Sequence, residues 1–349
     1  MSHAIYIYGL INSNEKKKFN PINKTNASEV YTIPFQDIAC VVSDYPEDSF
    51  DHRIKEKVAK ELVSHQTVIE KIMKEHTIIP VKFGTLLENC NEVRKVLEKG
   101  YFEFKQRLKE IDKKIELDLA AMWNDLNSVI KKISEEDEEI RKYKEEIVKK
   151  PPKDSFQDRI KIGSMIKDSL DKRREEMQKK MLEFLKSKVK IEGSKKHEIM
   201  YDRLVLNCAF LLDKNRESEF DKALSRLNEM FEDRINFRCI GPLPPYSFYT
   251  YEIKKANFEV IDMARKLLEL GVEVDASDIK AAYRRLVLEK HPDKHFNNIE
   301  AQKQFEEIQK AYKLLLDYCR SGKKPLNKED IEDTYLMSIF DTGYKREGE

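Results

Sequence analysis

The 349-residue sequence contains little glycine, tryptophan or cysteine, with ten, one and five residues respectively. Phosphate-cradling loops depend on glycine, and no GxxxxGK[ST] motif occurs, so we expect that the protein is not itself an ATPase. The cysteines are far apart, odd in number and form no CxxC pair. That pattern is typical of reduced, buried thiols in a cytoplasm and excludes a disulfide framework.

A surplus of charge of one sign is also missing. Lys and Arg total 65 and Asp and Glu total 64, which gives a net charge of +1. Nucleic-acid binders normally carry a basic surplus, so we expect no nucleic-acid partner. The longest apolar run, 204–212, is interrupted by Asn207 and is far shorter than the roughly 20 residues of a membrane helix. The first residues lack a signal-peptide pattern. We therefore expect no membrane partner and a cytoplasmic location.

Hydrophobic residues make up 40% of the chain and charged residues 37%, which favours real cores together with solvated helices. Apolar periodicity in the first third predicts strands and helices in the order β-β-α-β-α-β. We expect the strands at 3–11, 37–44, 77–87 and 114–121, the helices at 52–76 and 91–111, and a loop at 12–29. This order predicts an α+β sandwich with helices on one face of a small antiparallel sheet.

The middle of the chain changes character. Segment 131–150 has 14 charged residues in 20, seven of each sign, which predicts an exposed helix that ends at Pro151-Pro152. Segment 155–190 then regains helical periodicity over roughly 54 Å. A second β-α-β-β unit follows, with strands at 202–213, 236–240 and 247–253 and a helix at 218–231. After residue 257 only helices are expected.

The tripeptide His291-Pro292-Asp293 is the sharpest local signal, although three residues alone are weak evidence. It lies between predicted helices at 278–290 and 301–316, whose apolar residues recur on facing sides. Ser277 is the candidate N-cap of the first helix. Two antiparallel helices would therefore present the tripeptide at the tip of their connecting loop. His291 and His295 have no third ligand nearby, so no metal site is expected.

The segments KAAYRRLVLEKHPDK and QFEEIQKAYKLL resemble the J-domain of DnaJ-type co-chaperones over about residues 257–318. The resemblance implies docking onto a DnaK-type ATPase chaperone and stimulation of its ATP hydrolysis, with the signalling role at His291, Pro292 and Asp293. The preceding helix carries more basic than acidic side chains, which would steer it toward an acidic chaperone surface. The basic residues predicted to bind the chaperone are Lys280, Arg284, Arg285 and Lys290, against Asp278 and Glu289. Glu289 departs from the family pattern.

The region before this module resembles the GvpL/GvpF family of gas vesicle proteins. The blocks AIYIYGLI, ELVSHQ, TIIPVKFGTLLEN, DRLVLNCAFLL and CIGPLPPYSFYTYEI carry the resemblance in the family's order. It implies two α/β lobes joined by helices, and a role in assembling the gas vesicle shell by binding its small hydrophobic shell protein. Lys82 stands where the family commonly has Arg, and the segment around 137–152 is unusually charged.

These observations together predict an α+β chain with two small ferredoxin-like lobes, long charged helices between them and a C-terminal all-α hairpin. We expect five parts: an N-terminal lobe (1–122), a charged helical region (123–200), a second lobe (201–256), a J-domain-like module (257–320) and a tail (321–349). A short helix is the candidate structure for the tail. If 330–340 folds back onto the hairpin, it could mask the tip.

The function predicted from the sequence is a gas vesicle assembly factor that binds shell protein and recruits a DnaK-type chaperone. Two alternatives stay open: a general DnaJ-like co-chaperone for unfolded clients, and a non-signalling adaptor with a degenerate J-domain. No catalytic site, cofactor or shell-binding surface is identified. Phe83-Gly84-Thr85 favours a turn over a catalytic loop, and 241–246 favours a structural turn over a partner contact. His65 is expected to be a hydrogen-bonded core histidine.

Overall fold

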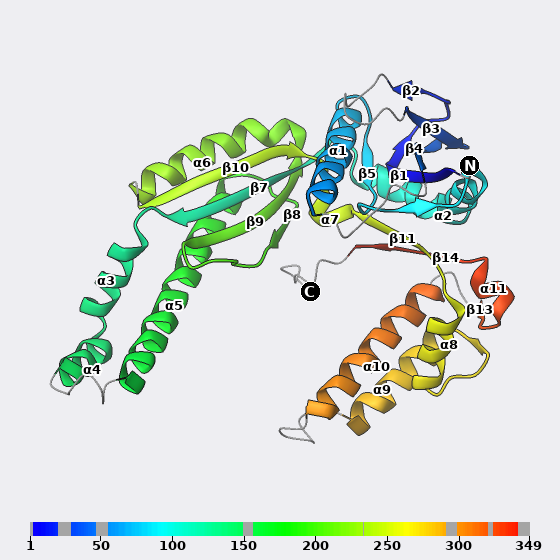
Figure 1. Cartoon of the computed structure of the whole chain (residues 1–349). Helices are drawn as coiled ribbons and strands as arrows, with labels where there is room; N and C mark the ends of the chain where they lie inside the picture. The colour runs from blue at the N-terminus through cyan, green and yellow to red at the C-terminus, as the bar shows by residue number, and fades with distance from the viewer. Residues whose placement is uncertain are drawn as a thin grey trace. The chain divides into compact units, whose positions relative to one another are not determined.

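The computed structural model describes residues 3–19, 29–46, 55–148, 156–232, 234–290, 299–319 and 324–340 (Figure 1). The chain forms two compact units. One contains residues 1–108 and 249–340, and the other contains residues 109–248. The chain thus leaves the first unit after Leu108 and returns to it at Tyr249. The five-part division expected from the sequence stays a prediction.

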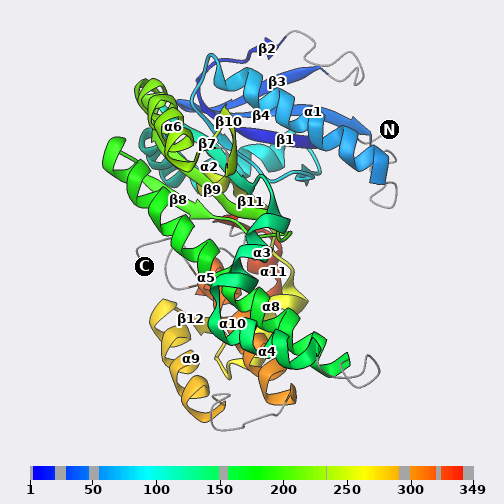
Figure 2. The same ribbon diagram turned by 90° about the vertical axis from the view of Figure 1, so that its left-hand side faces the viewer.

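A six-stranded antiparallel sheet is the framework of the first unit. Its strands follow the order β2-β3-β4-β1-β5, with β6 also paired to β1, and the row from β2 to β1 is visible in both views (Figures 1 and 2). The strands are β1 (His3–Asn12), β2 (Lys18–Phe19), β3 (Val30–Phe35), β4 (Ile38–Pro46), β5 (Ile78–Pro80) and β6 (Leu86–Leu87), and the helices are α1 (Lys55–Met73) and α2 (Cys90–Glu110).

Both faces of this sheet are covered, which corrects the expectation of helices on one face only. Strand β4 buries six consecutive residues from Ile38 to Ser43, so neither set of alternating side chains faces water. The structure also contains β3, for which the sequence predicted no element; it directly follows the predicted loop at 12–29. Pro34 interrupts that strand's pattern, and it is tolerated because β2 pairs only with Val30 and Tyr31 and leaves the rest of β3 as an edge.

The second unit is built on a four-stranded antiparallel sheet with the order β10-β7-β9-β8. Its strands are β7 (Lys114–Trp123), β8 (Gly193–Lys196), β9 (Leu204–Asp213) and β10 (Ile235–Leu243). The expectation that the strand at 114–121 completes the first sheet is therefore wrong. Strand β7 pairs with β9 over almost its whole length and with β10 on its other side. Local sequence pattern could not predict these partners, because both lie far ahead in the sequence.

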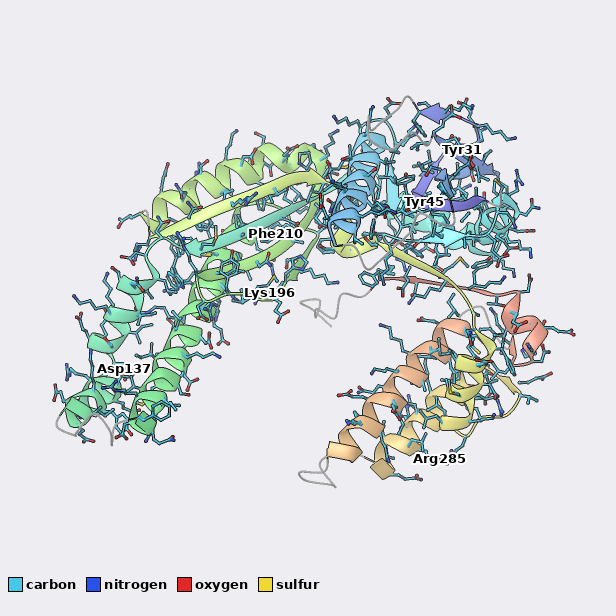
Figure 3. The ribbon with its side chains drawn as sticks, in the orientation of Figure 1. Tyr31, Tyr45, Asp137, Lys196, Phe210 and Arg285 are labelled. Carbon is cyan, nitrogen blue, oxygen red and sulfur yellow. The ribbon has the colours of Figure 1, made fainter. Side chains whose placement is uncertain are left out.

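Helices α3 to α5 of the second unit occupy the predicted charged region, with one break that was not predicted. They are α3 (Leu126–Glu136), α4 (Glu138–Val148), α5 (Phe156–Lys188), α6 (Glu217–Phe231) and the single turn α7 (Tyr246–Tyr249), and a 3-10 turn, η2 (Lys214–Arg216), precedes α6. The predicted helix across 131–150 is interrupted at Asp137 (Figure 3), whose carboxylate accepts hydrogen bonds from the amides of Glu139 and Ile140. This cap starts α4 anew. The long helix predicted at 155–190 is confirmed as α5.

The segment after residue 250 returns to the first unit as strand β11 (Tyr251–Lys255) and then builds a helical module. The module's elements are α8 (Phe258–Leu267), β12 (Glu273–Val274), α9 (Ala276–Lys290), α10 (Ile299–Tyr318), β13 (Lys324–Pro325), α11 (Lys328–Glu332) and β14 (Tyr335–Ile339). The prediction that only helices follow 257 is wrong, because β12 pairs with β13 and β14 pairs with β11. The strand predicted at 247–253 is split into α7 and β11.

The chain is therefore a mixed α+β protein with open sheets and a helical C-terminal module. The ferredoxin-like detail of the two lobes stays a prediction. Within the described ranges, no helix is both long and apolar enough to cross a bilayer.

Candidate functional site

The helical module has its own apolar core, built from the positions that the sequence periodicity indicated. Ile279 and Leu286 of α9 and Ile308 and Leu315 of α10 are each at most 2% exposed. The rings of Tyr283 and Tyr312 stack across the two helices with their centroids 4.0 Å apart. The inward-facing sides predicted for these helices are confirmed, so α9 and α10 pack as a hairpin.

Helix α9 begins at Ala276, two residues earlier than predicted, and its cap is not Ser277. The Asp275 carboxylate accepts hydrogen bonds from the amides of Ser277 and Asp278, at 2.7 and 3.0 Å. A carboxylate that reaches two free amides satisfies the helix end better than a serine hydroxyl inside the first turn.

The basic side of α9 is open to solvent. Lys280, Arg284 and Arg285 are all exposed. Arg285 lies on α9 (Figure 3) and pairs with Glu269 at 2.6 Å, but both side chains are more than half exposed, so this pair contributes little stability. The structure thus brings three of the predicted chaperone-binding cations onto one exposed helix.

The remaining predicted residues lie outside what the structure describes. His291, Pro292 and Asp293 fall in the segment between α9 and α10, and Lys290 closes α9 with a side chain that is likewise outside the described part. Their signalling roles, like those of the cations on α9, stay predictions.

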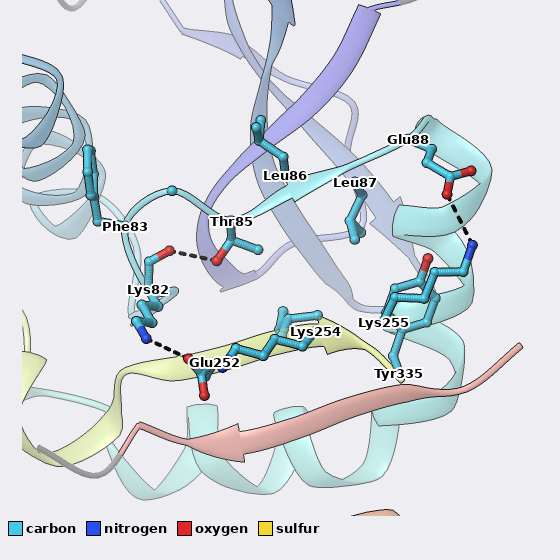
Figure 4. Close-up of a pocket in the computed structure, with 12 residues that line it drawn as sticks. Lys82, Phe83, Thr85, Leu86, Leu87, Glu88, Glu252, Lys254, Lys255 and Tyr335 are labelled. Atoms are coloured by element: carbon cyan, nitrogen blue, oxygen red, sulfur yellow. Dashed lines mark hydrogen bonds and ion pairs between the residues drawn. The ribbon is translucent and has the colours of Figure 1, made fainter. Parts of the chain in front are cut away.

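A pocket of about 550 Å³ lies beside β11, between it and the segment 82–88 of the first sheet (Figure 4). Lys82 Nζ pairs with Glu252 Oε1 at 2.5 Å, and Lys255 Nζ pairs with Glu88 Oε1 at 3.1 Å. Burial favours the neutral form of Glu252, but Lys82 and Lys254 outweigh it and hold the pKa of this carboxyl below its usual value. Every charge that we name here is neutralised by a neighbour, so the pocket joins two segments rather than offering a free ionic group.

The turn at Phe83-Gly84-Thr85 forms one wall of this pocket, and the structural interpretation is confirmed. Gly84 has φ 81°, a conformation that glycine adopts without strain. The Thr85 hydroxyl donates to the Lys82 carbonyl at 2.7 Å and closes the turn. His65 is also the core histidine that was expected. It is 4% exposed, its Nδ1 lies 2.9 Å from the Tyr6 hydroxyl, and burial lowers its pKa to about 4.

The second unit contains a polar cluster that sequence reasoning missed. Ser247 donates to both oxygens of Glu116, from its amide and from its hydroxyl, at 2.8 Å each. The Ser247 hydroxyl also lies 3.3 Å from His197 Nε2. Burial, and secondarily the neighbouring Asp118, raise the pKa of Glu116 to about 8, and burial raises the pKa of Asp118 as well.

The available signal was the spacing in KIELDLAA, where two acidic residues share one face of a strand that is otherwise apolar after Lys114. This cluster fastens α7 to β7 at the point where the chain leaves the second unit. Among the described residues, no group of three or more side chains is arranged to hold a metal ion.

An amphipathic hollow of about 990 Å³ lies between α3, α5 and the end of α6 in the second unit. Its lining includes Trp123, Met177, Phe184 and Met230, with charged side chains on the rim. Trp123, the only tryptophan in the chain, is 3% exposed, and within the described part of the chain its indole N–H has no hydrogen-bond partner. Buried indole groups usually have a partner, so this N–H is an unsatisfied donor of a residue that lines the hollow.

Comparison with known proteins divides the chain in the same way as its sequence motifs. Residues 4–250 match the model of the gas vesicle synthesis protein GvpL/GvpF family, and residues 266–320 match the DnaJ domain. Gas vesicle protein F1 of Halobacterium salinarum is 22% identical over 256 residues, which cover 72% of this chain and 96% of that protein. DnaJ homolog subfamily B member 8 of Homo sapiens is 42% identical over 91 residues, which cover 24% of this chain and 39% of that protein.

Two solved structures share the fold. The crystal structure of GvpF from Anabaena aligns with a TM-score of 0.61 at 19% identity and covers 71% of this chain and 99% of that one. The crystal structure of GvpF from Microcystis aeruginosa aligns with a TM-score of 0.57 at 17% identity over the same shares. The mixed α+β arrangement of the first two thirds of the chain is thus a fold that both solved structures have.

Proposed function

Because the chain belongs to the GvpL/GvpF family of gas vesicle synthesis proteins and also carries a DnaJ domain, we propose that it is an assembly factor for gas vesicles. In this proposal it binds the apolar shell protein and recruits a DnaK-type ATPase chaperone to it. The observation that carries the proposal is the presence of both modules in one chain. A shell that encloses gas needs apolar subunits, whose free form tends to aggregate.

The proposed division of labour follows the two modules. The exposed cations Lys280, Arg284 and Arg285 give α9 a positive surface that would attract an acidic face of the chaperone. The chain itself does no chemistry, and ATP hydrolysis belongs to the recruited chaperone. The protein would act in the cytoplasm, on gas vesicles as they grow.

The hollow in the second unit is the surface that we propose for the client. Methionine side chains adapt to differently shaped apolar partners, and a groove of this kind accepts the apolar side of an amphipathic helix. The proposed occupant is a helix of the shell subunit, with its apolar side on Met177, Phe184 and Met230 and its charged side on the rim.

The ATPase rate of a DnaK-type chaperone tests the chaperone half of this proposal. Full-length protein should raise the steady-state rate, and Asp293→Asn should return it to the unstimulated value, because the signalling carboxylate is lost while the size of the side chain is kept. The matched control is Glu306→Gln, an equally small change at an exposed position of α10. Equal stimulation by the wild type and by Asp293→Asn would contradict a signalling role and favour the adaptor.

A further inference from the structure

Strands β11 and β14 enclose the helical module and fall outside both matched regions. The GvpL/GvpF match ends at residue 250 and the DnaJ match covers 266–320, whereas β11 is Tyr251–Lys255 and β14 is Tyr335–Ile339. The two strands pair antiparallel in a continuous register from Tyr251↔Ile339 to Lys255↔Tyr335. The chain therefore enters and leaves the module through two strands that are bonded to each other.

Strand β14, through which the chain leaves the module, is also attached to helix α2 of the first unit. The Tyr335 hydroxyl donates to the Glu92 carboxylate, a bond that holds the pKa of Glu92 below its usual value. Asp333 pairs with Lys95 and Lys99 of α2 at 2.9 and 3.0 Å. Tyr335 is only 5% exposed, so its bond to Glu92 is shielded from competing water.

The entry strand is fastened independently. The Lys82 amide donates to the Tyr251 carbonyl at 2.8 Å, and the Tyr251 hydroxyl donates to Glu103 of α2 at 2.6 Å. The Tyr251 ring packs edge-on against Phe104 and is fully buried. Strand β11 is thus anchored to the N-terminal part of the first unit (residues 3–108), which we call the GvpF-type lobe. It presents a fixed edge with which β14 pairs.

The segment leading into β14 belongs to the module at the same time. Ile331 is fully buried in the module's apolar core, and Leu336 packs against that core. The module cannot swing away from the lobe without breaking either its own core or the β11–β14 ladder. A DnaJ domain on a simple C-terminal extension would have one covalent tether and no such constraint.

We propose that the tail from Ile331 to Ile339 is a strap that holds the DnaJ module in one position on the GvpF-type lobe by adding strand β14 to strand β11. The proposal rests on the proposed function and adds a regulatory element to it: a chaperone recruited by the module works at a fixed place on the assembly factor. A module on a loose tether would still signal, but at a lower effective concentration near the client.

The hydrogen-bond pattern of the ladder supplies a matched pair of variants. The Ala256 amide donates to Thr334 and the Phe340 amide donates to Thr250. Because bonded and non-bonded pairs alternate in an antiparallel ladder, Glu252 and Ser338 form a bonded pair, whereas Tyr251 and Ile339 do not. Ser338→Pro therefore deletes an N–H that points at β11, and Ile339→Pro deletes one that points away.

Hydrogen–deuterium exchange on the full chain tests the strap. In Ser338→Pro the amides of Glu252 and Lys254 should exchange roughly tenfold or more faster than in Ile339→Pro, while the amides of β4 keep their wild-type protection. Equal exchange of β11 in the two variants would overturn the proposal. If β4 loses protection in Ser338→Pro, Asp333→Asn combined with Tyr335→Phe replaces it, and unchanged β11 exchange in that double variant would overturn the proposal instead.

Two functional readouts separate the strap from the proposed function. Ser338→Pro should stimulate the chaperone ATPase as well as wild type does, but should support fewer gas vesicles in cells than Ile339→Pro does. Equal vesicle yield from the two proline variants would contradict the strap's role in assembly. If the wild type does not stimulate the ATPase, the proposed function is contradicted. The strap is then tested by the hydrogen–deuterium exchange comparison alone.

Discussion

Glu116 is a buried carboxyl that the fold prefers in its neutral form. It is 1% exposed and its pKa is raised to about 8, first by burial and then by Asp118. In the unfolded chain the same group titrates near its ordinary value of 4.5. Between these two values the folded state binds a proton that the unfolded state does not, so the free energy of unfolding falls as the pH rises from about 4.5 to about 8.

Glu116→Gln should remove most of this fall. The amide oxygen can still accept from Ser247, and the side chain no longer ionises. We expect the variant to match the wild type near pH 5 and to be more stable above pH 8, by a few kcal/mol at about 1.4 kcal/mol per unit of pKa shift. Urea denaturation at both pH values measures this, with Glu98→Gln on the exposed side of α2 as the control for loss of one carboxylate. A variant less stable than wild type at high pH would show that the fold stabilises the ionised form of Glu116 rather than the neutral one.

Residue types predicted some local features of the chain and not others. The buried positions of α9 and α10 follow from apolar spacing, because both helices bury one side against each other. The cap at Asp275 was missed in favour of Ser277 because both residues suit a helix start, and only the path of the backbone decides which side chain reaches the free amides.

At the scale of elements, helices were predictable and strand partners were not. The helix of 155–190 and the hairpin after 276 follow from periodicity within each segment. The partners of β7 lie about 90 and 120 residues later in the chain, and the alternation within KIELDLAA is the same whichever sheet it joins. The tail segment YLMSI is similar: its apolar residues suit a helix, and it becomes a strand because β11 offers an unpaired edge.

The hollow proposed to bind the shell protein gives a prediction at the scale of elements. Met230 lines the hollow and is 55% exposed, so Met230→Glu should leave folding intact and place a charge where an apolar helix would pack. We expect binding of the shell protein to weaken by about tenfold, equivalent to about 1.4 kcal/mol. A binding titration with the solubilised shell subunit measures it. The matched control is Val63→Glu, at the 61% exposed Val63 of α1. Equal affinities of the two variants for the shell protein would contradict the proposal that the hollow binds it.

At the scale of the whole molecule, the chain combines two modules whose proposed functions bear on the same hazard. An apolar shell subunit must be kept from aggregating before it joins the shell, and a DnaK-type chaperone releases bound segments in cycles driven by ATP. If both proposed functions hold, fusing the recruiting module to the assembly factor would raise the chaperone's effective concentration at the client without any new contact to the client. The family matches support each half separately, and the coupling between the halves is our proposal.

The most direct measurement of that claim is a pull-down from cells that make gas vesicles, with the wild type beside Asp293→Asn and with bound proteins identified by mass spectrometry. We expect the wild type to retain both the shell protein and a DnaK-type chaperone, and the variant to lose only the chaperone. If both baits retain the shell protein and neither retains a chaperone, the module does not signal, and the coupling proposed here is contradicted.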